Sequence, residues 1–237
     1  MSRWYDRRFA RILGGRSAAA WGIFRVPERK LRLLGPTRGK NVLEVGCGAA
    51  RWSVALARGG ARPTGIDLSS VQLAHARGVQ KASGVRFPLV RGSAERLPFG
   101  DGSFDLVFCD WGALTFTDPA RSLPECARVL RTGGALVFAT ASPLRYVTLD
   151  LAKDRQVRRL VRPYHGSYRV EFEPDAAVEF NPPYGVWVEL FRKNGLRVER
   201  LLEPRPTPGQ RSRYLSRADA EWARSWPLEA IWKLVKE

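Results

Sequence analysis

The sequence has few of the residues that build disulfide frameworks and metal sites. It contains three cysteines in 237 residues (Cys47, Cys109 and Cys126), and no two of them have C-x-x-C spacing. Because each lies among apolar neighbours, we expect reduced thiols in a cytoplasmic protein and no metal site. There are only two histidines, so a general base of that type has few candidates.

Long apolar runs are missing too. No window approaches the roughly 18 uninterrupted apolar residues that a membrane-spanning helix needs. Residues 1–30 are rich in arginine and interrupted by charges, so they do not have the apolar core of a signal peptide. The length suits one core with decorations, and the apolar share of 44% is ordinary for a globular protein. We expect a single domain, and the sequence leaves open whether it is a monomer or a homodimer.

Acidic residues are the scarce charge. The chain has 23 aspartates and glutamates against 40 lysines and arginines, which gives a net charge of +17. Much of the excess lies in residues 1–40, and a second basic cluster consists of Lys153, Arg155, Arg158, Arg159, Arg162 and Arg169. Such patches attract nucleic acid or anionic substrates. However, arginine outnumbers lysine 33 to 7, which favours an origin in codon bias.

A glycine turn at residues 42–48 organises the chain. The apolar start of the segment Val-Leu-Glu-Val-Gly-Cys-Gly predicts a buried strand, and its two glycines allow a tight turn and close approach to a ligand. Residues 49–58 then have helical composition, which places helix amides toward that ligand. The dinucleotide fingerprint G-x-G-x-x-G would need glycine at position 51, where this chain has Arg51.

The pattern E-x-G-x-G-x-A from Glu44 to Ala50 resembles motif I of class I S-adenosylmethionine (SAM) dependent methyltransferases. Within that family the similarity is to small-molecule methyltransferases like those of ubiquinone biosynthesis. The family usually has a third glycine where this chain has Ala50. The resemblance implies SAM as cofactor, S-adenosylhomocysteine as its product, and a cofactor loop that contains Glu44, Gly46, Cys47 and Gly48.

A second predicted strand, residues 62–67, ends in an acid. Asp67 follows Gly46 by 21 residues, which is the spacing at which a carboxylate accepts hydrogen bonds from ribose hydroxyls. Leu68 comes next and is expected to lie against the adenine face. The alternative for Asp67 is a cap of the following helix, a role that Ser69 would fill equally well.

The predicted third strand, residues 86–91, leads into a segment similar to the family's G-D-A-x-x-L-P-F. Here the adenine edge is expected to meet Ser93, the Ala94 amide and Glu95. The family's aspartate is replaced by Ser93, whose hydroxyl still accepts a hydrogen bond but carries no charge.

The segment 103–110 resembles the family's S-F-D-x-V pattern and predicts a fourth strand. Its carboxyl end should face the methyl donor, because ligands of open α/β sheets lie beyond that end. Cys109, Asp110 and Trp111 are therefore expected beside the cofactor. Residues 128–135 resemble the family's R-V-L-K-P-G-G turn, in which the glycines end a helix.

We therefore expect an α/β fold: a Rossmann-like seven-stranded, mostly parallel sheet with an antiparallel last strand and helices on both faces. The expected parts are an N-terminal helical lid (1–38), a SAM-binding core (39–142), a substrate cap inserted after the fifth strand (143–183) and a C-terminal helix with strands (184–237). The lid is expected to contain helices at residues 4–13 and 26–34. The alternative is that this segment only packs onto the domain.

His165 in the expected cap and Asp110 are the candidates for a general base or substrate contact. The alternatives are an ordinary surface or core histidine, and a structural or substrate-orienting aspartate. The run Asn-Pro-Pro-Tyr at 181–184 resembles the acceptor-amine motif of DNA and RNA N-methyltransferases. It follows the fifth strand instead of the fourth, so we interpret it as the entry to a helix.

Four functions remain to be compared. The motifs favour a methyltransferase with a small-molecule acceptor, and the basic charge supports a tRNA or rRNA methyltransferase as the alternative. An NAD(P)-dependent oxidoreductase is disfavoured by Arg51. A non-catalytic SAM-fold module would need a degenerate pocket, yet the acid and glycines of motif I and Asp67 are intact.

Overall fold

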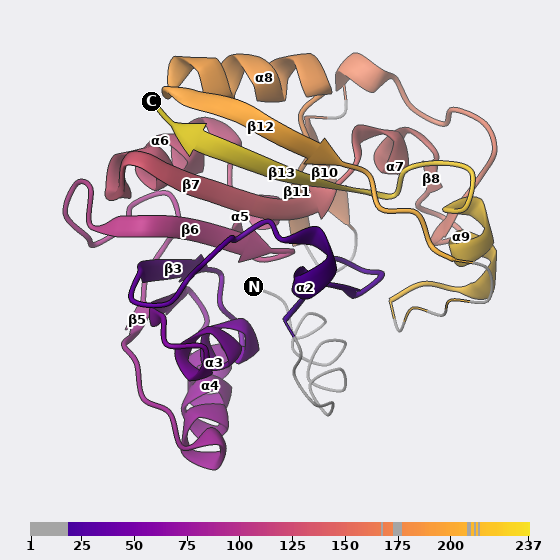
Figure 1. The fold of residues 1–237 in the computed structure, drawn as a ribbon. Helices are drawn as coiled ribbons and strands as arrows, with labels where there is room; N and C mark the ends of the chain where they lie inside the picture. The colour runs from indigo at the N-terminus through magenta and orange to yellow at the C-terminus, as the bar shows by residue number, and fades with distance from the viewer. Residues whose placement is uncertain (1–18, 167, 173–176, 208–209, 211, 213) are drawn as a thin grey trace.

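The computed structural model describes residues 19–166, 168–172, 177–207, 210, 212 and 214–237. Its main sheet contains the strands β3 (Asn41–Val45), β4 (Arg62–Asp67), β5 (Leu89–Arg91), β6 (Phe104–Asp110), β7 (Leu130–Ala141), β12 (Leu196–Leu202) and β13 (Glu229–Lys236). Their spatial order is β12-β13-β7-β6-β3-β4-β5 (Figure 1). Strands β3 to β7 pair in parallel, whereas β13 runs antiparallel to β7 and to β12. The predicted sheet is confirmed.

Helices cover both faces of this sheet (Figure 1). The helices that follow the N-terminal segment are α3 (Arg51–Arg58), α4 (Ser70–Ser83), α5 (Ala113–Phe116), α6 (Pro119–Val129), α7 (Pro143–Val147), α8 (Tyr184–Lys193) and α9 (Arg217–Trp222). Successive strand residues point to opposite faces. Leu43 accordingly belongs to the buried cluster that contains Trp187 of α8, and Val42 to the cluster that contains Trp52 of α3. Among the described residues, no helix is both long and apolar enough to cross a bilayer.

The helix predicted at residues 26–34 is wrong. A two-stranded hairpin, β1 (Ala20–Trp21) with β2 (Val26–Pro27), precedes a single helical turn, α2 (Glu28–Leu31). The turn ends because Arg32 has a left-handed backbone with φ of 52°. The carboxylate of Glu28 accepts hydrogen bonds from Trp21 Nε1 and the Leu34 amide, so the chain folds back. The helix predicted at residues 4–13 lies outside the described residues.

Two other boundaries differ from the prediction. The third strand is shorter than 86–91, because β5 begins at Leu89. The fifth strand, which the sequence predicts at residues 136–139, is longer, since β7 begins at Leu130 directly after α6. The glycines at 133–134 therefore do not end the helix. Gly133 has φ of 75°, and the pairing of β6 with β7 shifts register beside it, so these glycines accommodate an irregularity in the strand.

The segment between β7 and α8 lies beyond the carboxyl end of β7 (Figure 1). It contains α7, the hairpins β8 (Leu149–Asp150) with β9 (Arg155–Gln156) and β10 (Arg169–Phe172) with β11 (Ala177–Phe180), and the short turn η1 (Tyr164–Gly166). This is the position at which a substrate cap is expected. The division of the chain into lid, core, cap and C-terminal part stays a prediction.

Candidate cofactor and acceptor site

The glycine loop joins β3 to α3 at the carboxyl edge of the sheet. Gly46 has φ of 71°, and a Cβ atom there would lie 2.1 Å from the backbone nitrogen of Ala113. Gly48 also has a left-handed backbone, with φ of 52°. Both positions favour glycine because of their left-handed backbone. Gly46 favours it also because Ala113 of α5 packs against the loop. This is the narrow turn that motif I requires for close approach of a ligand.

Ala50 occupies the N-cap position of α3 with φ of 52°. A left-handed backbone costs an L-residue roughly 1–2 kcal/mol, and glycine avoids this cost. The structure thus gives a physical reason for the glycine that is usual in the family at this place. Alanine keeps the loop geometry because it is small enough to be completely buried there.

Asp67 ends β4 and fixes the glycine loop. Its Oδ2 accepts a hydrogen bond from the Gly48 amide and its Oδ1 one from the Ser69 amide, each 2.8 Å long. Ser69 is the N-cap of α4, so the capping alternative for Asp67 is not used. A carboxylate oxygen can accept more than one hydrogen bond, which is the chemistry that ribose hydroxyl donors need. Leu68 beside it is 55% exposed, as a surface for an adenine ring would be.

The three residues expected near the adenine edge have different environments. Ser93 is half-buried and its Oγ accepts a hydrogen bond from the Glu95 amide, whereas Ala94 is buried. Glu95 is engaged with α6: its carboxylate accepts from the Asp118 amide at 3.2 Å and pairs with Arg121 at 3.1 Å. These contacts support a structural role for Glu95.

Glu44 lies beneath the glycine loop and is almost completely buried. Its Oε2 accepts hydrogen bonds from the amide and the hydroxyl of Ser53, so it fixes the start of α3. Burial raises the pKa of Glu44 to about 8, and the charges of Asp110 and Asp67 add to this in the same direction. The carboxyl is thus poised to ionise when a positive charge approaches. Cys47 next to the loop is a buried free thiol that contacts Gly65.

Asp110 at the end of β6 is bound to the N-terminal hairpin. Its two carboxylate oxygens accept hydrogen bonds from the Gly22 amide at 2.8 Å and from Trp52 Nε1 at 3.0 Å. Burial raises its pKa, although these two hydrogen bonds lower it. Its neighbour Cys109 is a buried free thiol, and its sulfur accepts a hydrogen bond from the Leu114 amide. The hairpin is therefore tied to the carboxyl end of β6, and its role as a lid stays a prediction.

Trp111 follows with a strained backbone, φ of 51°, at the place where donor and acceptor are expected to meet. Its Nε1 donates a hydrogen bond to Glu229 Oε2 at 2.9 Å, and the Ile23 amide donates to the same oxygen at 2.7 Å. Burial raises the pKa of Glu229 to about 7. Asp110 and Glu229 thus bind the consecutive amides of the hairpin turn.

Glu229 is a site residue that sequence reasoning missed. The sequence predicts the last strand at residues 230–235, so Glu229 falls just outside it, whereas β13 begins at Glu229. A single carboxylate at the start of an apolar strand was the sequence feature that could have identified this residue. The structure makes this position informative, because β13 is antiparallel and its first residue lies at the carboxyl edge of β7.

His165 lies on the exposed turn η1 in the cap, and its ring contacts that of Tyr164. The turn contacts α7 but carries the histidine at the surface. Asn181 of the Asn-Pro-Pro-Tyr run is completely buried and donates through Nδ2 to the Ser142 carbonyl. Pro183 is the N-cap of α8, as the helix-entry interpretation predicts.

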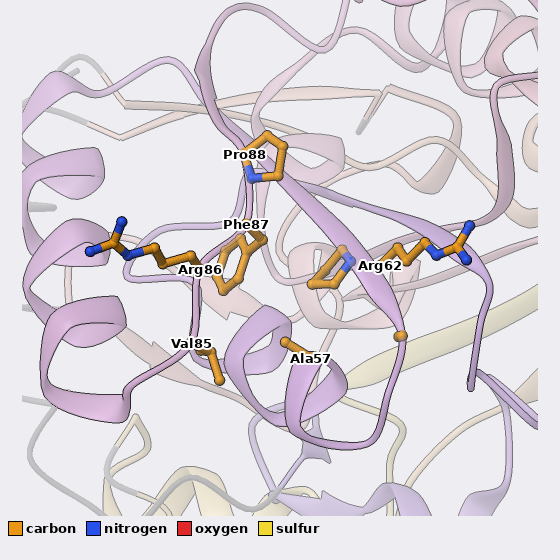
Figure 2. Close-up of a pocket in the computed structure, with 8 residues that line it drawn as sticks. Ala57, Arg62, Val85, Arg86, Phe87 and Pro88 are labelled. Carbon is orange, nitrogen blue, oxygen red and sulfur yellow. The ribbon is translucent and has the colours of Figure 1, made fainter.

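A pocket of about 370 Å³ lies elsewhere (Figure 2). Its lining consists of Ala57, Ala61, Arg62, Pro63, Val85, Arg86, Phe87 and Pro88. Arg62 begins β4 and the run 85–88 precedes β5, so this pocket is at the amino ends of the strands. Ligands of open α/β sheets bind at the opposite edge, and we therefore do not assign the cofactor to this pocket.

Comparison with known proteins agrees with this geometry. Residues 43–138 match the family model described as a methyltransferase domain. The matched segment runs from β3 into β7, the part of the chain in which the sequence motifs predict a SAM-binding core.

Solved structures share the fold over most of the chain. A SAM-dependent methyltransferase from Mesorhizobium loti is 23% identical, with a TM-score of 0.71 over 88% of this chain and 96% of that one. A putative SAM-dependent methyltransferase from Listeria monocytogenes is 19% identical, with a TM-score of 0.72 over 89% and 97%.

Curated relatives match a shorter part of the chain. The ubiquinone biosynthesis O-methyltransferase of Aromatoleum aromaticum is 39% identical over 103 residues, which are 43% of this chain and 44% of that protein. The demethylmenaquinone methyltransferase of Listeria welshimeri is 37% identical over 119 residues, 48% of this chain and 50% of that protein. The chain therefore spans about half the length of the curated relatives it matches.

Proposed function

We propose that this protein is a SAM-dependent methyltransferase with a small-molecule acceptor. The observation that carries the proposal is the unit formed by Gly46, Gly48 and Asp67 at the carboxyl ends of β3 and β4. Its left-handed glycines and its carboxylate, fixed by the loop amide, fit the ribose and methionine parts of SAM. The relatives act in quinone biosynthesis according to their names, which supports a small acceptor.

The roles of the residues follow from their positions. Asp67 would accept hydrogen bonds from the ribose, Leu68 would cover the adenine ring, and Ser93 with the Ala94 amide would meet its edge. The backbone around Cys109 would face the methionine ammonium, a charge that the ionised form of Glu44 favours. SAM, when bound, supplies a methyl group already activated on sulfur, so the chain's task is to align the acceptor and exclude water.

The N-terminal hairpin is suited to exclude water. Trp21 is completely buried, with its ring centroid 4.8 Å from that of Trp52 and 6.2 Å from that of Phe108. Asp110 accepts a hydrogen bond from the Gly22 amide of this hairpin. The contacts of Asp110 therefore favour a structural or substrate-orienting role over that of a general base. His165 remains a candidate base that cap closure would have to bring inward.

The alternative is an RNA methyltransferase. Its support is the basic cap, in which Arg155, Arg158 and Arg159 are all exposed. Phosphate contacts through arginine would make binding fall steeply as salt rises.

Methyl transfer distinguishes these functions. Radiolabelled SAM would be incubated with the protein and either total RNA or the small-metabolite fraction of a cell extract. We expect label in the metabolite fraction. Label in RNA alone would favour the alternative, and no transfer to either fraction would count against the proposed enzyme.

A further inference from the structure

Arg145 is a half-buried arginine at the acceptor side of the site. It belongs to α7, which follows β7 directly at the carboxyl edge of the sheet, and its amide donates to the N-cap hydroxyl of Ser142. Its guanidinium carbon lies 5.4 Å from the ring centroid of Trp111 and 5.8 Å from that of Tyr146. Two aromatic rings therefore fix the position of this cation.

The guanidinium has no anionic partner within the described part of the chain. Its Nε is buried there without a hydrogen-bond acceptor. The two carboxylates next to the flanking rings are used otherwise, since Glu229 accepts from Trp111 Nε1 and Glu179 from the Tyr146 hydroxyl. A buried N–H donor that has no acceptor is unfavourable, so the Nε group favours the approach of a ligand acceptor.

Arg128 shows what this protein does with a structural arginine. That side chain, also half-buried, pairs with Glu125 and Asp101 and donates to the carbonyls of Leu97 and Phe99. Arg145 has none of these contacts although it lies beside the strained residue that follows β6. The difference indicates that its donors are kept for a ligand.

We propose that Arg145 binds an anionic oxygen of the methyl acceptor, so that the acceptor is a small carboxylate or phenolate. This inference rests on the proposed function and specifies its substrate class. A planar guanidinium matches a carboxylate with two parallel hydrogen bonds, and the rings behind it hold that plane in place. Trp111, which bears the guanidinium on its face, would then place the anion next to the methyl donor.

The test separates the small-metabolite fraction on an anion-exchange resin and assays each part with radiolabelled SAM. We expect acceptor activity in the retained part. Retention at about pH 7 is expected for a carboxylate acceptor, whereas retention only above about pH 10 is expected for a phenol. Activity that is never retained would overturn the inference while leaving the methyltransferase intact. No transfer by the wild type in any part would refute the proposed function, and the inference with it.

Variants assign the effect to this side chain. Arg145→Gln should raise the KM for the retained acceptor about tenfold or more, the loss expected for a charged hydrogen bond, with SAM affinity unchanged. Arg145→Lys should have a KM for the retained acceptor between those of the wild type and Arg145→Gln, because lysine keeps the positive charge but lacks the planar pair of donors. Arg158→Gln, a neutralised but exposed arginine of the same cap, should behave as the wild type. A wild-type KM in Arg145→Gln would contradict the proposal.

Discussion

Glu44 should make the folded protein less stable as the pH rises. Its pKa is raised by burial from an ordinary 4.5 to about 8. Between these values the folded protein keeps the proton while the unfolded chain releases it, so the free energy of unfolding falls with rising pH. The contribution is fully present below about pH 4.5 and is lost by about pH 8. At 1.36 kcal/mol for each pH unit, the loss reaches about 5 kcal/mol at most.

The assay is urea unfolding of the wild type and of Glu44→Gln at several values between about pH 5 and about pH 8.5. Glutamine keeps a similar shape and cannot ionise, so it removes this titration while the other acids remain. The variant should gain stability relative to the wild type as the pH rises, by up to about 5 kcal/mol. A difference between the two proteins that does not change with pH, or that changes in the opposite direction, would refute the reasoning.

Two further predictions use matched pairs. Gly46→Ala should abolish SAM binding and destabilise the fold by about 2 kcal/mol or more, because its Cβ would meet the Ala113 backbone. Gly78→Ala, in the middle of α4 where a Cβ atom meets no neighbour, should instead stabilise the fold by about 0.5–1 kcal/mol in the same urea unfolding assay. Calorimetric titration with SAM measures cofactor binding by both variants. Trp21→Ala should cost about 3–5 kcal/mol, since the ring is completely buried, whereas Trp226→Ala should cost less than about 1 kcal/mol because that ring is 46% exposed. Equal unfolding midpoints for the two tryptophan variants would show that the hairpin is not packed as described.

The sheet could be predicted because its signals are local. Apolar runs that end in Gly46, Asp67 and Asp110 identify three strands and place their ends at one edge. That edge is where the structure brings Asp67 to the Gly48 amide. The spatial order of the parallel strands, β7-β6-β3-β4-β5, differs from their order along the chain, and no local signal predicts it.

The N-terminal segment could not be predicted in the same way. Its composition resembles a helix, but its conformation depends on partners far along the chain. Asp110 accepts a hydrogen bond from the Gly22 amide, 88 residues away in the sequence. Glu229 accepts one from the Ile23 amide, 206 residues away. No local pattern encodes such hydrogen bonds, and they stabilise a hairpin where propensity favours a helix.

The position of Arg145 could not be predicted for a related reason. Arg145 is one of many arginines in the sequence, and only the fold places it against Trp111 and Tyr146 without a carboxylate partner among the described residues. In contrast, His165 attracts notice in the sequence because histidine is rare, yet it lies on an exposed turn.

Calorimetric titration of SAM into the wild type and Asp67→Ala tests the central claim most directly. Loss of a charged hydrogen bond should weaken binding by roughly 1.5–3 kcal/mol. Asp105→Ala is the control, because that carboxylate begins β6 at the opposite edge, where it pairs with Arg131 and accepts from the Asn41 amide. We expect binding to the wild type, wild-type affinity in Asp105→Ala and weakened affinity in a folded Asp67→Ala. Absence of binding to the wild type, or equal affinity in Asp67→Ala, would contradict the assignment of this site.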